Sequence, residues 1–312
     1  MAGAQAAPLV GGLGGGAEPR RRRRLRFDSA YLYLLPATLL ILFVFGYPTV
    51  QSILLSIQRN RGIRDPGRFA GIDNFVELWR SPVFWQVTGQ TFIWTVGVVG
   101  ATTVLAFVLA LILNQNFRGK GIFRTIVILP AATSLAVSAM VWKYAFDPNG
   151  LVNHTLAGFG PADNGIAWLA DSPQAMAAII FVGIVVSVPL TAVMISAAMR
   201  SISRDLYEAA ALDGASRLVQ TFRITLPLSR TMLLITTLAN FVVAFNSFPI
   251  IFVMTNGGPI NRTDILATYL YQQGFQILNF GLASALAVVV LVILLGLSLA
   301  YVHLLIHRTR VG

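Results

Sequence analysis

The chain contains no cysteine and few charged residues. The absence of cysteine excludes disulfides, thiolate metal sites and cysteine nucleophiles. Charged residues make up 11% of the 312 residues, whereas a soluble domain carries about a quarter. Apolar residues reach 56%, and the mean hydropathy is +0.72. Several apolar runs exceed the roughly 18 residues that indicate a membrane span. We therefore predict an all-α integral membrane protein, although the length alone suggests about two soluble domains.

Motifs for catalysis, nucleotide binding and metal binding are also missing. Gly119-Lys120 is followed by Gly121, and position 114 is Asn, so the phosphate-binding pattern G-x4-GK[ST] is not formed. The three histidines include His303 and His307, four residues apart, which could suggest a metal pair. No carboxylates accompany them, so we interpret them as interfacial side chains at a helix end. We expect no catalytic residue, metal or cofactor on this chain.

The formal net charge of +11 raises the question of nucleic-acid binding. The basic residues, however, cluster beside apolar runs, which is typical of membrane topology and predicts no nucleic-acid partner. Residues 1–19 are rich in Gly and Ala, and Arg20–Arg24 and Arg26 follow. We expect residues 1–30 to form a disordered, basic cytoplasmic tail. The apolar sequence from Tyr31 is too long for a signal peptide, so we interpret it as a retained first span.

Six predicted spans make up a single membrane domain over residues 31–312. Each is long enough to cross about 30 Å of hydrocarbon as a helix. The predicted spans are Tyr31–Ile57, Thr88–Leu113, Arg124–Phe146, Gln174–Met199, Thr231–Met254 and Gly281–Ile306.

Lysine and arginine predict the orientation of these spans. With the N-terminus inside, sixteen of the 23 basic residues fall on the cytoplasmic side and seven outside. The outer loop Gln58–Val87 carries five of those seven, which weakens the prediction. The outer loop Asp147–Pro173 has three Asp and no Lys or Arg, which supports it. We expect both termini to be cytoplasmic.

The inside loop at 200–230 has a helix-turn-helix pattern. Ser203 can cap a first helix, in which Asp205 and Glu208 lie near the positive end of the helix dipole. Gly214 is placed where a helix ends in a left-handed residue. Ser216 can cap a second helix, and Pro227 is expected to separate that helix from the fifth span.

The same loop fits the spacing EAA-x3-G-x9-I-x-LP at every position. Small side chains on an exposed helix allow a partner to approach the backbone closely. Glu and Ala are common helix formers, so E-A-A alone is typical of an ordinary solvated loop; the complete pattern favours a docking element. Its candidate residues are Glu208, Ala209, Ala210, Asp213, Gly214, Ile224, Leu226 and Pro227.

This pattern closely resembles the coupling loop of binding-protein-dependent ABC importer permeases. A second signature, Thr255–Pro259, is a turn followed by Thr263, Leu266, Tyr269, Tyr271, Phe275 and Phe280-Gly281. Together they resemble the first permease subunit of the maltose-type and glycerol-3-phosphate-type importers, in its six-span form, from about residue 31 onward. The chain departs from many relatives in having Val185, Val186 and Ser187 where they carry a tryptophan in the fourth span.

The resemblance implies the type I importer permease fold and a role in sugar import through a bacterial inner membrane. It implies a heterodimer with a second permease, two copies of an ATPase subunit that bind ATP and Mg, and an extracytoplasmic solute-binding protein. In the family the coupling loop docks in a groove of the ATPase.

Polar side chains inside spans mark a candidate solute path, because they are costly in lipid and usually face an interior. Asn240, Ala244 and Ser247 are expected to share one face of the fifth helix. Their alternative role is hydrogen bonding between helices. The candidates are Ser187, Thr191, Asn240, Phe245, Asn246 and Ser247.

Two other functions compete with the importer permease. An ion-coupled secondary transporter usually needs ionisable groups at mid-membrane, and the predicted spans contain none away from their ends. An intramembrane enzyme needs a catalytic set at a defined depth, and none stands out. The sequence therefore favours the importer permease.

Overall fold

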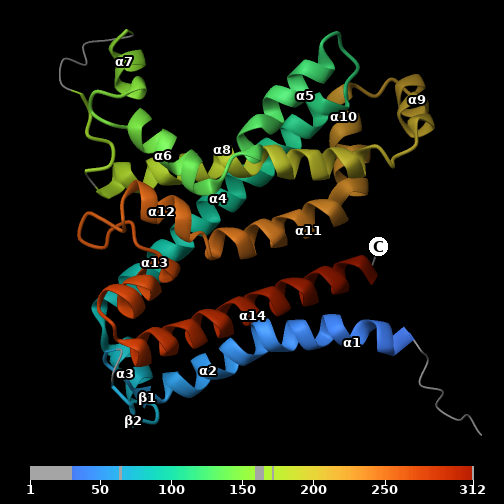
Figure 1. The fold of residues 1–312 in the computed structure, drawn as a ribbon. Coiled ribbons are helices and arrows are strands. Elements are labelled where there is room, and N and C mark those ends of the chain that lie inside the picture. Colours follow the sequence, from blue (N-terminus) through green and yellow to red (C-terminus); the bar gives the residue numbers. More distant parts are fainter. Residues whose placement is uncertain (1–29, 63–64, 159–164, 171, 311–312) are drawn as a thin grey trace, which may run out of the picture. The chain divides into compact units, whose positions relative to one another are not determined.

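The computed structural model describes residues 30–62, 65–158, 165–170 and 172–310 (Figure 1). The predicted tail therefore lies outside the described residues, apart from Ala30. The chain divides into two compact units, residues 1–49 and 50–312.

In the described part of the first unit, α1 (Ala30–Ile41) continues through the π-helical turn η1 (Leu42–Gly46) into α2 (Tyr47–Ser56), whose residues from Val50 onward belong to the second unit. Pro48 is the second residue of α2, directly after the π turn, and the Tyr47 amide bonds to the Leu42 carbonyl, five residues back. Proline lacks an N–H and its ring clashes with the carbonyl four residues earlier. The wider π turn accommodates that clash, so the helix continues past the proline.

Long apolar helices dominate the second unit. They are α4 (Pro82–Asn114), α8 (Ser172–Met199), α11 (Leu226–Phe245) and α14 (Phe280–Arg310). With the first span, five helices in the described residues are long and apolar enough to cross a membrane, or six if one bent pair counts as a span. The Ser81 hydroxyl caps α4 by accepting from the Phe84 amide at 3.4 Å, and Pro82 occupies the first helical position.

The bent pair corrects the third predicted span, which is not one continuous helix. It consists of α5 (Lys120–Ile128), the 3₁₀ turn η2 (Leu129–Ala132) and α6 (Leu135–Ala145), with a bend of 97°. Pro130 lies in η2, where its missing N–H breaks the helical ladder. The Thr133 hydroxyl then bonds to the Pro130 carbonyl at 2.8 Å and pairs with the Ser138 hydroxyl at 2.6 Å.

The fifth predicted span is also broken. α11 ends at Phe245, and a separate short helix, α12 (Phe248–Met254), follows. Pro249 is the second residue of α12, so it has no N–H to offer the Phe245 carbonyl. The Trp94 indole donates to the Ala244 carbonyl at 2.8 Å, which pairs a group at the helix end.

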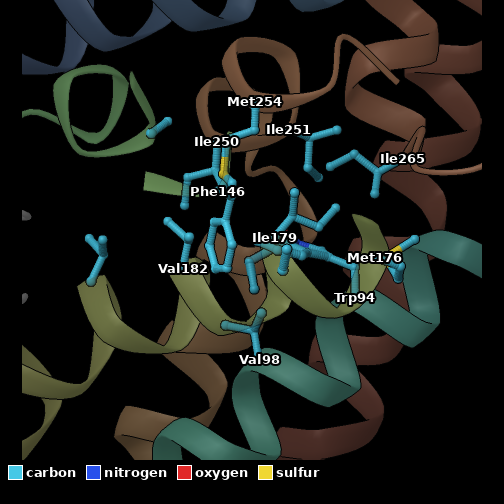
Figure 2. Packing of buried hydrophobic residues seen from close by; sticks show 14 of the residues in the cluster. Trp94, Val98, Phe146, Met176, Ile179, Val182, Ile250, Ile251, Met254 and Ile265 are labelled. Atoms are coloured by element: carbon cyan, nitrogen blue, oxygen red, sulfur yellow. Dashed lines mark hydrogen bonds between the residues drawn. The ribbon is translucent and has the colours of Figure 1, made fainter. Parts of the chain in front are cut away.

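A buried aromatic and aliphatic cluster surrounds this break. Trp94 and Val98 of α4 meet Ile179 and Val182 of α8, and α12 covers them (Figure 2). Figure 2 labels further members of the cluster, namely Phe146, Met176, Ile250, Ile251, Met254 and Ile265. Gly183 permits the close packing of α4 on α8, because a side chain there would collide with the Trp94 ring.

The predicted outer segments contact one another. The strands β1 (Gln58–Arg59) and β2 (Arg68–Phe69) pair antiparallel, with Gln58 opposite Phe69. Asn74, in α3 (Asp73–Arg80), donates to the Ser56 and Gln58 carbonyls, at 2.8 Å in each case. The Gly62 amide bonds to the Leu278 carbonyl at 2.8 Å. Within the second unit, these contacts bring Ser56–Gly62, α3 and Leu278 together.

The remaining outer elements are short. α7 (Leu151–Ala157) follows α6, and α13 (Leu266–Tyr271) continues into the π turn η4 (Gln272–Gln276) before α14. Asn153 of α7 is buried and organises its loop, because its side-chain oxygen Oδ1 accepts from the Trp168 indole at 3.0 Å and from the Ile166 amide at 3.2 Å. The loop at 200–230, predicted to be inside, contains α9 (Arg204–Leu212), α10 (Arg217–Gln220) and the π turn η3 (Thr221–Thr225).

Candidate coupling loop and solute path

The first helix of the loop at 200–230 begins as the sequence predicts. The Ser203 hydroxyl caps α9 by accepting from the Asp205 amide at 3.3 Å. Asp205 lies in the first turn, where a carboxylate is stabilised by the helix dipole. Glu208 follows one turn later and is exposed.

Gly214 ends this helix in a left-handed conformation, with φ of +79°. The Ala215 amide bonds to the Ala210 carbonyl at 2.9 Å, and the Gly214 amide bonds to the Ala211 carbonyl at 3.0 Å. These two bonds form a Schellman motif, which satisfies carbonyls at the helix end. A Cβ at position 214 would meet nothing within 4 Å, so this chain itself leaves room there.

The second half of the loop differs from the prediction. Ser216 caps α10 by accepting from the Val219 amide at 3.4 Å. Pro227 does not separate this helix from the fifth span, because α10, η3 and α11 form one helix from Arg217 to Phe245. The Leu226 amide bonds to the Thr221 carbonyl, five residues back, so the π turn precedes the proline as η1 precedes Pro48.

Three residues that the sequence did not single out hold the two halves together. The Tyr207 hydroxyl on α9 pairs with the Thr225 hydroxyl in η3 at 3.0 Å. The Gln220 amide group donates to the Ala215 carbonyl at 3.2 Å and to the Tyr207 carbonyl at 3.5 Å. No local pattern marks these residues, because their partners lie up to 18 positions away.

The loop presents an apolar surface, which we call the coupling knob. Its large side chains are Leu212, Leu218 and Phe222, which are 91%, 71% and 63% exposed. Among the predicted coupling residues, five are exposed and three are half-buried. The exposed ones are Glu208, Ala209, Asp213, Gly214 and Pro227, and the half-buried ones are Ala210, Ile224 and Leu226. Exposed apolar patches of this kind mark contact surfaces for a partner.

Among the solute-path candidates, Asn240 and Thr191 contact each other between α11 and α8. The Asn240 amide nitrogen donates to the Thr191 hydroxyl at 3.0 Å. The Thr191 hydroxyl in turn bonds to the Ser187 carbonyl at 2.8 Å, and Thr191 is buried. The bond between helices that the sequence left as an alternative role is therefore present.

The predicted shared face of Asn240, Ala244 and Ser247 is wrong for Ser247. Helix α11 ends before it, and Ser247 is the buried N-cap residue of α12. Phe245 is fully buried within the chain, packed near Phe92 and Phe241, so it presents no surface to a solute here. Asn246 is exposed, and its side chain donates to the Val242 carbonyl at 3.2 Å.

Helix α4 contributes polar groups that the sequence did not single out. Gln90, Thr95 and Thr102 are buried, and their side-chain oxygens have no hydrogen-bond partner among the described residues. Thr91, beside Gln90, does have one, because its hydroxyl accepts from the Leu266 amide at the start of α13 at 2.9 Å. The sequence pattern does not reveal these residues, because isolated polar residues barely change the hydropathy of a long apolar run.

The turn at 255–265 contains a buried carboxylate. The Asp264 side chain accepts from the Thr268 hydroxyl at 2.8 Å and from the Gln272 amide at 3.1 and 3.2 Å. Burial raises the pKa of Asp264, and these hydrogen bonds partly oppose the rise. Gly257, with φ of +80°, packs directly on the carboxylate, and a Cβ there would collide with it. This contact explains why position 257 of the second signature is a glycine.

Residues 102–310 match the family described as "Binding-protein-dependent transport system inner membrane component". The chain belongs to this permease family. The permease is 39% identical to a probable ABC transporter permease protein of Brucella suis biovar 1, over 88% of this chain and 95% of that protein. It is 32% identical to the lactose transport system permease protein LacF of Rhizobium radiobacter, over 86% and 91% of the two chains.

Further matches extend the comparison to another transport system and to solved structures. The sn-glycerol-3-phosphate transport system permease protein UgpA of Yersinia pestis is 29% identical, over 90% of the permease and 95% of that protein. A crystal structure of a bacterial ABC transporter that imports the acidic polysaccharide alginate matches with a TM-score of 0.77 and 24% identity, over 88% and 94% of the chains. This likeness shows the fold.

The permease is thus a transport component of an inner-membrane, binding-protein-dependent importer, and not an enzyme. The resemblance inferred from the coupling pattern is confirmed, and so are the helical membrane fold and the importer function. The matches give no support to the ion-coupled transporter or the intramembrane enzyme. Within the described residues, no group of three or more His, Asp or Glu side chains is placed to hold a metal.

Proposed function

We propose that the permease imports a sugar or sugar-like solute, such as an oligosaccharide, a polyol or a glycerol phosphate. The support comes from its relatives, of which one belongs to a lactose transport system and another to an sn-glycerol-3-phosphate transport system. The fold is shared with an importer of alginate. Hydroxyl and amide side chains inside the spans are the groups that recognise sugar hydroxyls.

The proposed assembly contains four kinds of component. The permease pairs with a second permease to form the translocation path in a bacterial plasma membrane, with both termini in the cytoplasm. Two copies of an ATPase subunit bind ATP and Mg below it. A solute-binding protein on the outer side delivers the solute, and alternating access follows from ATPase closure.

The observation that carries this proposal is the exposed coupling knob together with its connection to α11. The Schellman turn at Gly214 leaves room for a partner, and Tyr207 and Gln220 tie α9 to the helix that contains Asn240. Closure of the ATPase on the knob therefore moves the helix that carries Asn240, the one retained candidate on α11. We keep the candidates Ser187, Thr191, Asn240, Phe245, Asn246 and Ser247, of which Thr191, Phe245 and Ser247 are buried within this chain.

The test compares Gly214→Leu with Gly214→Ala in the complete importer, reconstituted in vesicles. Both variants carry a Cβ in the left-handed conformation, which costs about 1–2 kcal/mol, so they share the backbone strain. They differ in bulk. We expect ATP-driven uptake to fall at least tenfold further in Gly214→Leu than in Gly214→Ala, with equal membrane insertion.

The solute for this assay is identified first, by a thermal-shift screen of the cognate binding protein against sugars and sugar phosphates. Equal uptake by the two variants would contradict docking at Gly214. Uphill uptake by the permease without any ATPase subunit would contradict the proposed function as a whole.

A further inference from the structure

A small cavity at the inner ends of three helices contains two arginines. It lies between α4, α5 and α8 and has a volume of about 160 Å³. Its lining residues are Leu113, Arg124, Val193, Ser196, Ala197 and Arg200. The lining combines three apolar side chains with a serine and two arginines, so it is amphipathic.

Asn114, the last residue of α4, holds one of these arginines in place. Its side-chain oxygen accepts from Arg200 Nε at 3.4 Å and from the Ser196 hydroxyl at 3.2 Å. Its nitrogen donates to the Ser196 carbonyl at 3.4 Å and to Met199 Sδ at 3.2 Å. The bond from Nε leaves the four terminal N–H groups of the Arg200 guanidinium for another acceptor.

The positive charge of this cavity has no acidic counterpart in its lining. The two ion pairs found among the described residues, Arg59 with Asp73 and Arg61 with Glu77, lie in the outer segments. The inner segment 114–124 carries Arg118, Lys120 and Arg124 and no Asp or Glu. Two like charges at one cavity repel each other, and an anion between them removes that repulsion. Guanidinium groups suit a phosphate because they offer paired N–H donors.

We propose that this cavity binds the phosphate group of an anionic phospholipid from the cytoplasmic leaflet. Basic pockets between spanning helices on the cytoplasmic side are suited to lipid headgroups. The apolar wall formed by Leu113, Val193 and Ala197 is suited to the start of an acyl chain. The choice of leaflet rests on the proposed orientation of the permease.

The position of the site gives it a consequence for coupling. Arg200 directly follows α8, and only residues 201–203 separate it from α9. A lipid bound to Arg200 therefore fixes the point from which the coupling knob extends.

The test uses the complete importer in nanodiscs of phosphatidylcholine, titrated with phosphatidylglycerol, and follows retained lipid by native mass spectrometry. We expect Arg124→Gln/Arg200→Gln to lower the apparent affinity for phosphatidylglycerol at least tenfold. Arg118→Gln, in the same inner segment but outside the cavity lining, is the matched control and is expected to bind like the unmodified protein. Equal binding by the double variant and the unmodified protein would overturn the proposal.

Two further arms complete the design. Inorganic phosphate, added to the phosphatidylcholine nanodiscs, distinguishes a lipid headgroup from free phosphate as the ligand. Competition between phosphate and phosphatidylglycerol supports the phosphate site. Saturation of the site by phosphate, with no effect of phosphatidylglycerol, would overturn the lipid assignment. If the double variant fails to assemble, Arg124→Gln alone is used, because it leaves the bond that Arg200 donates to Asn114 intact. The assay measures lipid binding and not transport, so its result does not depend on whether the permease imports a sugar.

Discussion

At the scale of single residues, the polar groups in the spans have a structural partner as well as a candidate solute. Asn240 and Thr191 bond to each other between α11 and α8. Such bonds between membrane helices contribute about 0.6 kcal/mol on average. Loss of the pair alone is therefore too small to unfold the permease, and an effect on transport can be measured separately.

We expect Asn240→Ala to raise the transport KM several-fold, because the amide is lost from the proposed path. The measurement is uptake in vesicles over a range of solute concentrations. Thr236→Ala is the control, since the buried Thr236 hydroxyl on the same helix bonds to the Met232 and Leu233 carbonyls of its own helix. An unchanged KM in Asn240→Ala would remove this residue from the path.

The buried carboxyl group of Asp264 predicts that the stability of the permease depends on pH. Burial raises its pKa above the ordinary value of 3.8, so the native state binds more protons than the unfolded state between 3.8 and the raised pKa. Stability is therefore expected to fall as the pH rises through that window, and to level off above it. The measurement is the thermal midpoint of the purified importer from about pH 4 toward neutrality.

Asp264→Asn is expected to flatten this dependence, because the side chain no longer ionises while its oxygen can still accept from Thr268. Parallel pH profiles for the two proteins would show that another group is responsible.

At the scale of elements, a π turn connects the coupling knob to the fifth span. Proline at 227 prevents the amide of that position from bonding to the Arg223 carbonyl, and η3 accommodates this loss. The turn therefore sets the angle at which α10 meets α11. A π turn contains one more residue than an α-helical turn, and one residue corresponds to a rotation of about 100° about the helix axis. The turn therefore changes the direction in which the side chains of α10 point relative to those of α11.

We expect Pro227→Ala to convert η3 to a regular α-helical turn and to lower coupled uptake about tenfold, with normal membrane insertion. The measurement combines uptake with the distance between spin labels on α9 and α11. Pro36→Ala makes the same chemical change in α1 and is expected to leave coupling intact. Full uptake by Pro227→Ala would show that the π turn does not matter for coupling.

The positions of the spanning segments could be predicted from the sequence, but whether each segment is one continuous helix could not. Hydropathy reports that a run is apolar, but it does not detect that Pro130 and Pro249 break the third and fifth spans. Ser203, Gly214 and Ser216 were predicted correctly as helix caps, because capping depends on neighbours within a few positions. The pairing of Trp94 with Ala244 joins positions 150 apart, so no local pattern reveals it.

At the scale of the whole molecule, the sidedness of the chain is a prediction from charge. The absence of native cysteine allows a direct test with single introduced thiols. Leu212 of the coupling knob and Ile260 of the 255–265 turn are suitable sites, since they are 91% and 88% exposed.

We expect Ile260→Cys to react with a membrane-impermeant maleimide in intact cells, and Leu212→Cys to react only after permeabilisation. The unmodified, cysteine-free protein is the control for background labelling. Reaction of Leu212→Cys in intact cells would reverse the orientation and place the coupling knob away from any cytoplasmic ATPase.

The helix from Arg217 to Phe245 comprises 29 residues, which corresponds to about 43 Å. In a helix of that length, a rotation of about 5° about one end displaces the other end by roughly 4 Å. Leu218 and Phe222 of the coupling knob lie on the same helix as Asn240, so a small rotation of this helix at the membrane surface displaces the Asn240 amide by about the length of a hydrogen bond to a solute hydroxyl.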